Sequence, residues 1–71
     1  MPKTGEKYRH YSRGGEYEIV CLAKNEADES DVVVYKALYD QEHIWVRPLS
    51  NFVEKVLVDG VEVPRFRIIH V

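Results

Sequence analysis

The chain has 71 residues with a single cysteine, a single tryptophan, three prolines and no long apolar run. Cys21 alone cannot form a disulfide within the chain, and no set of Cys and His residues has the spacing of a zinc site. Apolar runs such as VVVY, at 32–35, are far too short to cross a bilayer, and MPKTGEKYRH lacks the apolar stretch of a signal peptide. We therefore expect a cytoplasmic protein in a reducing compartment, with no membrane contact, no cofactor and no metal.

Motifs of catalysis and phosphate binding are also missing. Gly14-Gly15 lacks the spacing of a phosphate-binding loop, and no helical pattern follows it. Cys21 lies in an apolar stretch with no charged neighbour on its face of a strand, which is typical of a structural thiol. An enzyme is therefore the less favoured interpretation, although an acid–base role for His10, next to Arg9, stays open.

The composition is that of a folded domain, with 45% hydrophobic and 31% charged residues. The net charge is −2, but it is unevenly distributed: the first fifteen residues are basic and residues 16–42 are strongly acidic. Phosphate contacts need a concentrated basic surface, so this charge argues against indiscriminate binding to polyanions. A local basic patch remains open if the two ends of the chain meet.

Short alternating apolar segments between turn residues predict an all-β fold. We expect residues 1–6 to be a flexible tail and residues 7–71 to form one domain. That domain is expected to be a small SH3-like barrel of five to six short, mostly antiparallel strands, because closure removes exposed strand edges. The expected strands are Lys7–Tyr11, Glu16–Lys24, Val32–Tyr39, Ile44–Arg47, Phe52–Val58 and Phe66–Val71.

Two further local signals lie in the second half of the chain. Asp59-Gly60 stands between Val56–Val58 and Val61–Val63, which is the code of a two-residue hairpin whose turn positions accept positive φ. Leu49–Asn51, after Pro48, predicts a tight turn or one short 3₁₀ turn. A helix over Leu49–Val58 is the alternative, although three valines in that segment are weak helix formers.

Aromatic and basic residues alternate in three of the expected strands. The candidate ligand-binding residues are Arg9, His10, Trp45, Arg47 and Arg65. Arginines beside a tryptophan on an outer face can hold an extended ligand, a nucleic-acid base or an anionic group. The competing interpretation is structural: Trp45 fills a small second core, and Arg47 packs over rings or pairs with acidic residues.

Four blocks of the sequence carry a family resemblance: YRHYSRGGEYEIV (8–20), VVVYKALY (32–39), WVRPLSNFVEKV (45–56) and PRF (64–66). Together they resemble the bacterial family catalogued as domain of unknown function 1653. Ser12-Arg13 precedes the glycines here, where the family usually carries a single Lys. The resemblance implies a small compact domain with no established activity, and it marks Arg9, His10, Trp45, Arg47, Pro48, Arg65 and Phe66 as motif positions.

Three functional hypotheses follow from these observations. The first is a binding or accessory domain for an anionic or nucleic-acid ligand at the Arg9, His10, Trp45, Arg47 and Arg65 surface. The second is a structural or protein-interaction module without its own ligand, either monomeric or a weak homodimer. The third is a small enzyme or metabolite-binding domain that uses His10.

Overall fold

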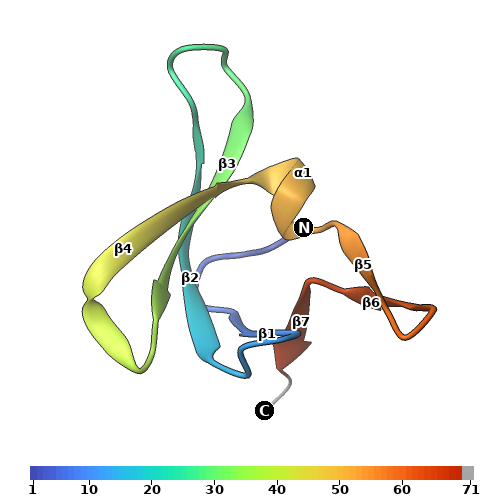
Figure 1. Ribbon diagram of the computed structural model, residues 1–71. Coiled ribbons are helices and arrows are strands. Elements are labelled where there is room, and N and C mark those ends of the chain that lie inside the picture. The colour runs from blue at the N-terminus through green and yellow to red at the C-terminus, as the bar shows by residue number, and fades with distance from the viewer. Residues whose placement is uncertain (70–71) are drawn as a thin grey trace.

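The computed structural model of the chain describes residues 1–69, except for the side chains of residues 41 and 42. Within these residues there are seven strands and one helical turn (Figure 1). The strands are β1 (Lys7–His10), β2 (Glu16–Lys24), β3 (Asp31–Ala37), β4 (Asp40–Pro48), β5 (Lys55–Val58), β6 (Val61–Pro64) and β7 (Phe66–Ile69), and the turn is α1 (Leu49–Phe52). The predicted all-β class is confirmed. In the described part of the chain, no helix is long and apolar enough to span a membrane.

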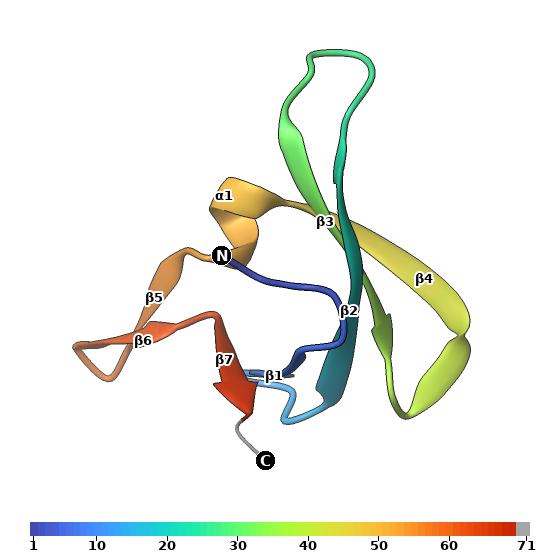
Figure 2. The same ribbon diagram turned by 180° about the vertical axis from the view of Figure 1, so that it is seen from behind.

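Five strands form one antiparallel sheet in the order β4-β3-β2-β1-β7, and β5 and β6 form a separate hairpin. The expected closure into an SH3-like barrel is not found within residues 1–69, because β4 and β7 stand at opposite ends of the strand order. The chain turns away from the sheet through α1 after β4, and the next two strands then pair with each other. Figures 1 and 2 show this hairpin leaving the body of the molecule between α1 and β7.

The Asp59-Gly60 hairpin forms as predicted. Asp59 has φ of 50° and Gly60 has φ of 79°, so both turn residues adopt the left-handed conformation that a two-residue turn requires. Val58 and Val61 face each other directly beside the turn. Strand β6 of this hairpin is the one additional strand relative to the six ranges expected from the sequence.

The segment after Pro48 is a single α-helical turn rather than a 3₁₀ turn or a longer strand. The amide of Val53 donates to the carbonyl of Leu49 at 3.1 Å, which is the spacing of an α-helix. The helical alternative for Leu49–Val58 therefore holds only for the first four residues, and the strand expected from Phe52 begins at Lys55. Tertiary packing stabilises this helical turn, because its residue Phe52 is fully buried.

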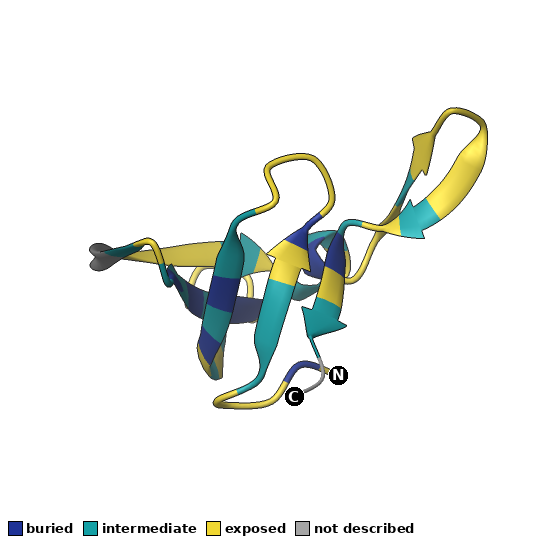
Figure 3. Ribbon diagram, turned by 90° about the horizontal axis from the view of Figure 1, so that it is seen from below, coloured by how far each residue is buried: buried dark blue, intermediate teal, exposed yellow. Residues whose placement is uncertain are grey.

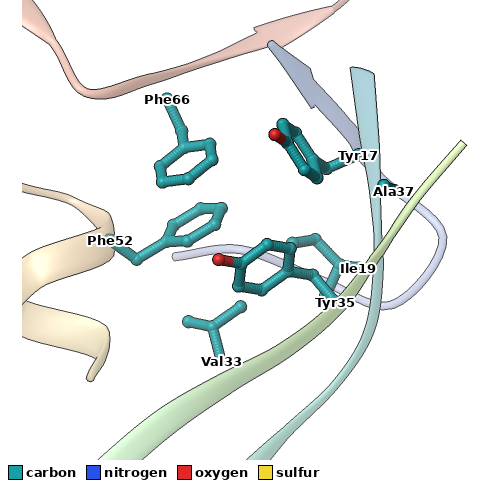
Figure 4. Close-up of a cluster of buried hydrophobic side chains, with 7 residues drawn as sticks. All are labelled: Tyr17, Ile19, Val33, Tyr35, Ala37, Phe52 and Phe66. Carbon is teal, nitrogen blue, oxygen red and sulfur yellow. The ribbon is translucent and has the colours of Figure 1, made fainter. Parts of the chain in front are cut away.

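A cluster of four aromatic rings fills the core between the sheet and α1 (Figure 4). Phe52 and Phe66 stack at 4.2 Å between ring centroids with an interplanar angle of 6°, and Tyr17 and Tyr35 meet edge to face at 5.5 Å. Aromatic pairs in these arrangements stabilise a core by about 0.5–1.5 kcal/mol beyond their buried area. Ile19, Val33 and Ala37 complete the cluster.

Residues 1–6 lie against β2 and reach toward α1 (Figure 2). Two backbone hydrogen bonds of 2.9 Å connect this segment to β2: the amide of Gly5 donates to the carbonyl of Ile19, and the amide of Ile19 donates to the carbonyl of Glu6. Pro2 is buried. The mobility expected of this segment stays a prediction.

Candidate functional site

An open cleft of about 330 Å³ lies where the β3–β4 hairpin faces the turn after β1. Its basic side chains come from three places: the end of β1, the following turn and β4. We call it the arginine cleft, and its principal lining residues are His10, Arg13, Tyr17, Tyr35, Tyr39, Trp45 and Arg47. Asp40 and Phe66 also line it. The cleft therefore combines positive charge, phenolic hydroxyls and one indole ring.

Arg47 is fixed at the wall of this cleft by three contacts. Its Nε donates to the hydroxyl of Tyr35 at 3.3 Å, and its Nη1 donates to the side-chain oxygen of Asn51 at 2.5 Å. Its guanidinium carbon lies 5.3 Å from the centroid of the Phe66 ring, which places the cation over an aromatic face. These contacts hold the planar guanidinium in one orientation and link β4 to β3 and α1.

His10 anchors the turn that carries the second arginine. It is buried, and its Nδ1 accepts hydrogen bonds from the amides of Ser12 at 3.2 Å and Arg13 at 3.4 Å. Nδ1 must be unprotonated to accept these bonds. Burial lowers the pKa of His10, and the positive charges of Arg13, Arg47 and Arg65 lower it further. His10 is therefore neutral in the folded protein at neutral pH, and it holds Arg13 at the cleft.

Arg13 and Arg47 supply the positive charge of the cleft. Among the side chains that the structure describes, neither forms an ion pair with a carboxylate. Asp40 supplies negative charge at one side of the cleft, where its carboxylate lies 2.9 Å from Nδ1 of His43. Two arginines without a carboxylate partner make this cleft a favourable place for an anion.

Three tyrosine hydroxyls add hydrogen-bonding groups to the cleft. The hydroxyls of Tyr17 and Tyr39 lie 3.1 Å apart, and burial followed by the bond to Tyr39 raises the pKa of Tyr17 to about 12. Tyr17 therefore stays a neutral hydroxyl at physiological pH. The hydroxyl of Tyr35 accepts a hydrogen bond from Arg47, so its own O–H remains available to donate in another direction.

Trp45 presents an open aromatic face beside the arginines. It is 50% exposed on β4, between Ile44 and Val46, which are also exposed. Its ring centroid lies 5.9 Å from that of His43. A half-exposed indole next to cationic groups can stack on a planar ligand ring.

The structure brings together three of the five residues that the sequence nominated, namely His10, Trp45 and Arg47. Arg9 points to the other face of β1, where it pairs with Glu16 at 3.0 Å, because successive side chains of a strand alternate in direction. Arg65 pairs with Glu54 at 3.2 Å, and it acts on the site through its charge near His10.

Sequence reasoning did not nominate Arg13 or the tyrosines. Arg13 stands in a Gly-rich turn whose path cannot be derived from strand periodicity. The signal that was present is the Ser12-Arg13 pair that replaces the single basic residue of the family pattern. In the part of the chain that the structure describes, no group of three or more His, Cys, Asp or Glu side chains could hold a metal ion.

Comparisons with known proteins identify a family for this chain, but they name no ligand. The model of a family described as "Protein of unknown function (DUF1653)" matches residues 6–68. The fold is similar to a crystal structure of a protein belonging to DUF1653 from Bordetella bronchiseptica, with a TM-score of 0.79 and 31% sequence identity over 97% of this chain and 86% of the other. No curated protein matches the chain.

Proposed function

We propose that this chain, which belongs to the DUF1653 family, is a small binding domain that holds the anionic group of its ligand in the arginine cleft. The observation that carries the proposal is the pair Arg13 and Arg47, which lie in one cleft without a carboxylate partner among the described side chains. A guanidinium held in a fixed orientation is suited to the oxygen atoms of a phosphate or carboxylate.

Single-stranded nucleic acid is the ligand class that fits the remaining features. Trp45 offers a stacking face for a base, while the arginines and tyrosine hydroxyls lie within the same cleft for a phosphate. A volume of about 330 Å³ suits one nucleotide in contact with the domain, with the rest of the strand crossing the surface. With a net charge of −2, binding would be modest and strongly weakened by salt.

Tryptophan fluorescence tests this proposal directly, since Trp45 is the single tryptophan of the chain. Short single-stranded RNA and DNA are titrated into the protein at low salt. We expect saturable quenching from base stacking. The affinity should fall as salt is raised: for each phosphate contact, the logarithm of the association constant should decrease by about 0.7 per tenfold increase in salt concentration.

Arg13→Gln and Arg9→Gln form a matched pair of variants. Both remove one positive charge, but only Arg13 lines the arginine cleft, and Arg9 lies on the other face of β1. Arg13→Gln should weaken binding, and it should reduce the salt dependence of the affinity by the share of about one phosphate contact. Arg9→Gln should change the affinity and its salt dependence little. Equal effects of the two variants, or no quenching at low salt, would contradict the proposal.

A structural role without a ligand is the second candidate, and one observation favours it. Two nitrogens of Arg47 donate hydrogen bonds, to Tyr35 and to Asn51, and these bonds connect β4 to β3 and α1. The guanidinium of Arg47 therefore also stabilises the fold. Arg13 distinguishes the binding role from the structural role, because its side chain forms no hydrogen bond or ion pair with the part of the chain that the structure describes, while its amide donates to His10. If Arg13→Gln alters neither binding nor any other property, the structural interpretation stands.

An acid–base role for His10 receives less support. Nδ1 is engaged by the amides of the following turn, and in the described part of the chain no carboxylate orients the ring. The expected cytoplasmic location and the monomeric or weakly dimeric state stay predictions, which fractionation and light scattering test.

A further inference from the structure

A second cleft, larger and more apolar than the first, lies in the corner where the chain bends from β6 into β7. It has a volume of about 470 Å³, and its apolar walls are Val58, Val63, Pro64, Ile68 and Ile69. The hairpin provides one wall and the edge strand of the sheet provides the other. Volumes of this size are typical of sites for small molecules. We call it the corner cleft.

The hairpin side of the corner cleft is the end of a continuous apolar face. Val56 is opposite Val63 and Val58 is opposite Val61, so all four valines lie on one face of the β5–β6 hairpin. The hairpin projects from the body of the molecule and is mostly exposed (Figure 3). An isolated two-stranded hairpin is marginally stable in water, so a ligand covering this face would stabilise it.

Two arginines stand side by side at the sheet wall of the corner cleft. Arg9 and Arg67 are direct partners in the antiparallel register of β1 and β7, and both line the cleft. Like charges placed opposite each other across two strands repel. Glu16 offsets Arg9, whereas Arg67 has no ion pair among the side chains that the structure describes. An anionic group next to Arg67 would relieve this repulsion.

We propose that the corner cleft binds a small amphipathic anion, with its apolar body against the valine-rich hairpin and its carboxylate or equivalent group at Arg67. The charge of the wall selects an anionic end, and the apolar walls select a hydrocarbon body over a sugar or a free phosphate. The inference does not depend on the arginine cleft, whose lining is more polar and whose cations are Arg13 and Arg47, although His10 lines both clefts.

Octanoate is a suitable probe, followed by amide chemical shifts in the full chain. We expect saturable shifts at Val58, Val63 and Ile68. Acetate, which lacks the apolar body, and octanol, which lacks the charge, should each bind more weakly than octanoate. Equal binding of octanol and octanoate, or no saturable shifts at these amides, would overturn the proposal.

Two pairs of variants locate the octanoate site. Arg67→Gln should weaken octanoate binding about fivefold, the effect of one exposed ion pair, whereas Arg13→Gln should leave it unchanged. Val58→Thr should weaken binding, while Val61→Thr, on the same valine face but outside the lining of the cleft, should not. A stronger effect of Arg13→Gln than of Arg67→Gln would place octanoate in the arginine cleft and overturn this inference, while leaving the proposed function in place.

Discussion

Replacement of Arg47 by methionine tests how much this residue contributes to the fold. Methionine keeps an unbranched apolar stem but removes the guanidinium, which donates to Tyr35 and Asn51 and lies over Phe66. Each of the two hydrogen bonds contributes about 1 kcal/mol, and the contact over the ring contributes about 0.5–1 kcal/mol. The substitution should therefore lower the free energy of unfolding by about 2.5–3 kcal/mol.

That loss is a large share of the stability of so small a domain. At the usual contribution per residue, a chain of 71 residues is stable by about 4–11 kcal/mol. Urea unfolding followed by circular dichroism measures the difference, and Arg9→Met is the matched control. Arg9 forms one exposed ion pair with Glu16, so its removal should cost less than about 1 kcal/mol. If Arg47→Met destabilises the protein no more than Arg9→Met does, the inferred network at Arg47 is refuted.

Three further predictions concern the core, the pH dependence and the hairpin. Phe52→Ala removes a fully buried ring and should cost about 3–5 kcal/mol, enough to leave much of the protein unfolded in circular dichroism; a native-like unfolding midpoint would contradict the described core. The pKa of His10 is lowered from 6.5 in the folded state, so below about pH 6.5 the unfolded chain binds more protons at this site than the folded chain, and the free energy of unfolding decreases as pH falls. His10→Gln should reduce this pH dependence in urea unfolding, and an unchanged dependence of the free energy of unfolding on pH would contradict it. Gly60→Ala should cost about 1 kcal/mol because φ is +79°, and hydrogen exchange should speed up in the hairpin rather than in β2 or β3; uniform acceleration would show that the hairpin does not open separately.

Local patterns predicted several elements with accuracy. The bounds of β2, Glu16–Lys24, agree with the structure, because alternating apolar residues are framed there by a Gly-Gly turn and a polar loop. The Asp59-Gly60 turn was equally predictable, since its conformation is specified by those two residues. The course of the chain after Pro48 was not, because the burial of Phe52 against Phe66 decides that α1 forms.

The candidate site shows a similar division. His10, Trp45 and Arg47 could be nominated from residue type, and they do line one cleft. Arg9 could not be assigned to a face without the register that pairs it with Glu16 and Arg67. Arg13 depends on the path of a turn, which the bonds accepted by His10 determine. The periodicity of the sequence therefore does not determine which strands pair with each other or which path a turn takes.

The central claim is that the arginine cleft, and not the basic surface in general, holds an anionic ligand. Mapping the amide shifts of the wild-type chain during titration with single-stranded RNA at low salt tests it most directly. We predict saturable shifts centred on Arg13, Trp45 and Arg47, with little change at Arg9. Shifts that are absent, or spread evenly over the basic residues of both faces, would contradict the account.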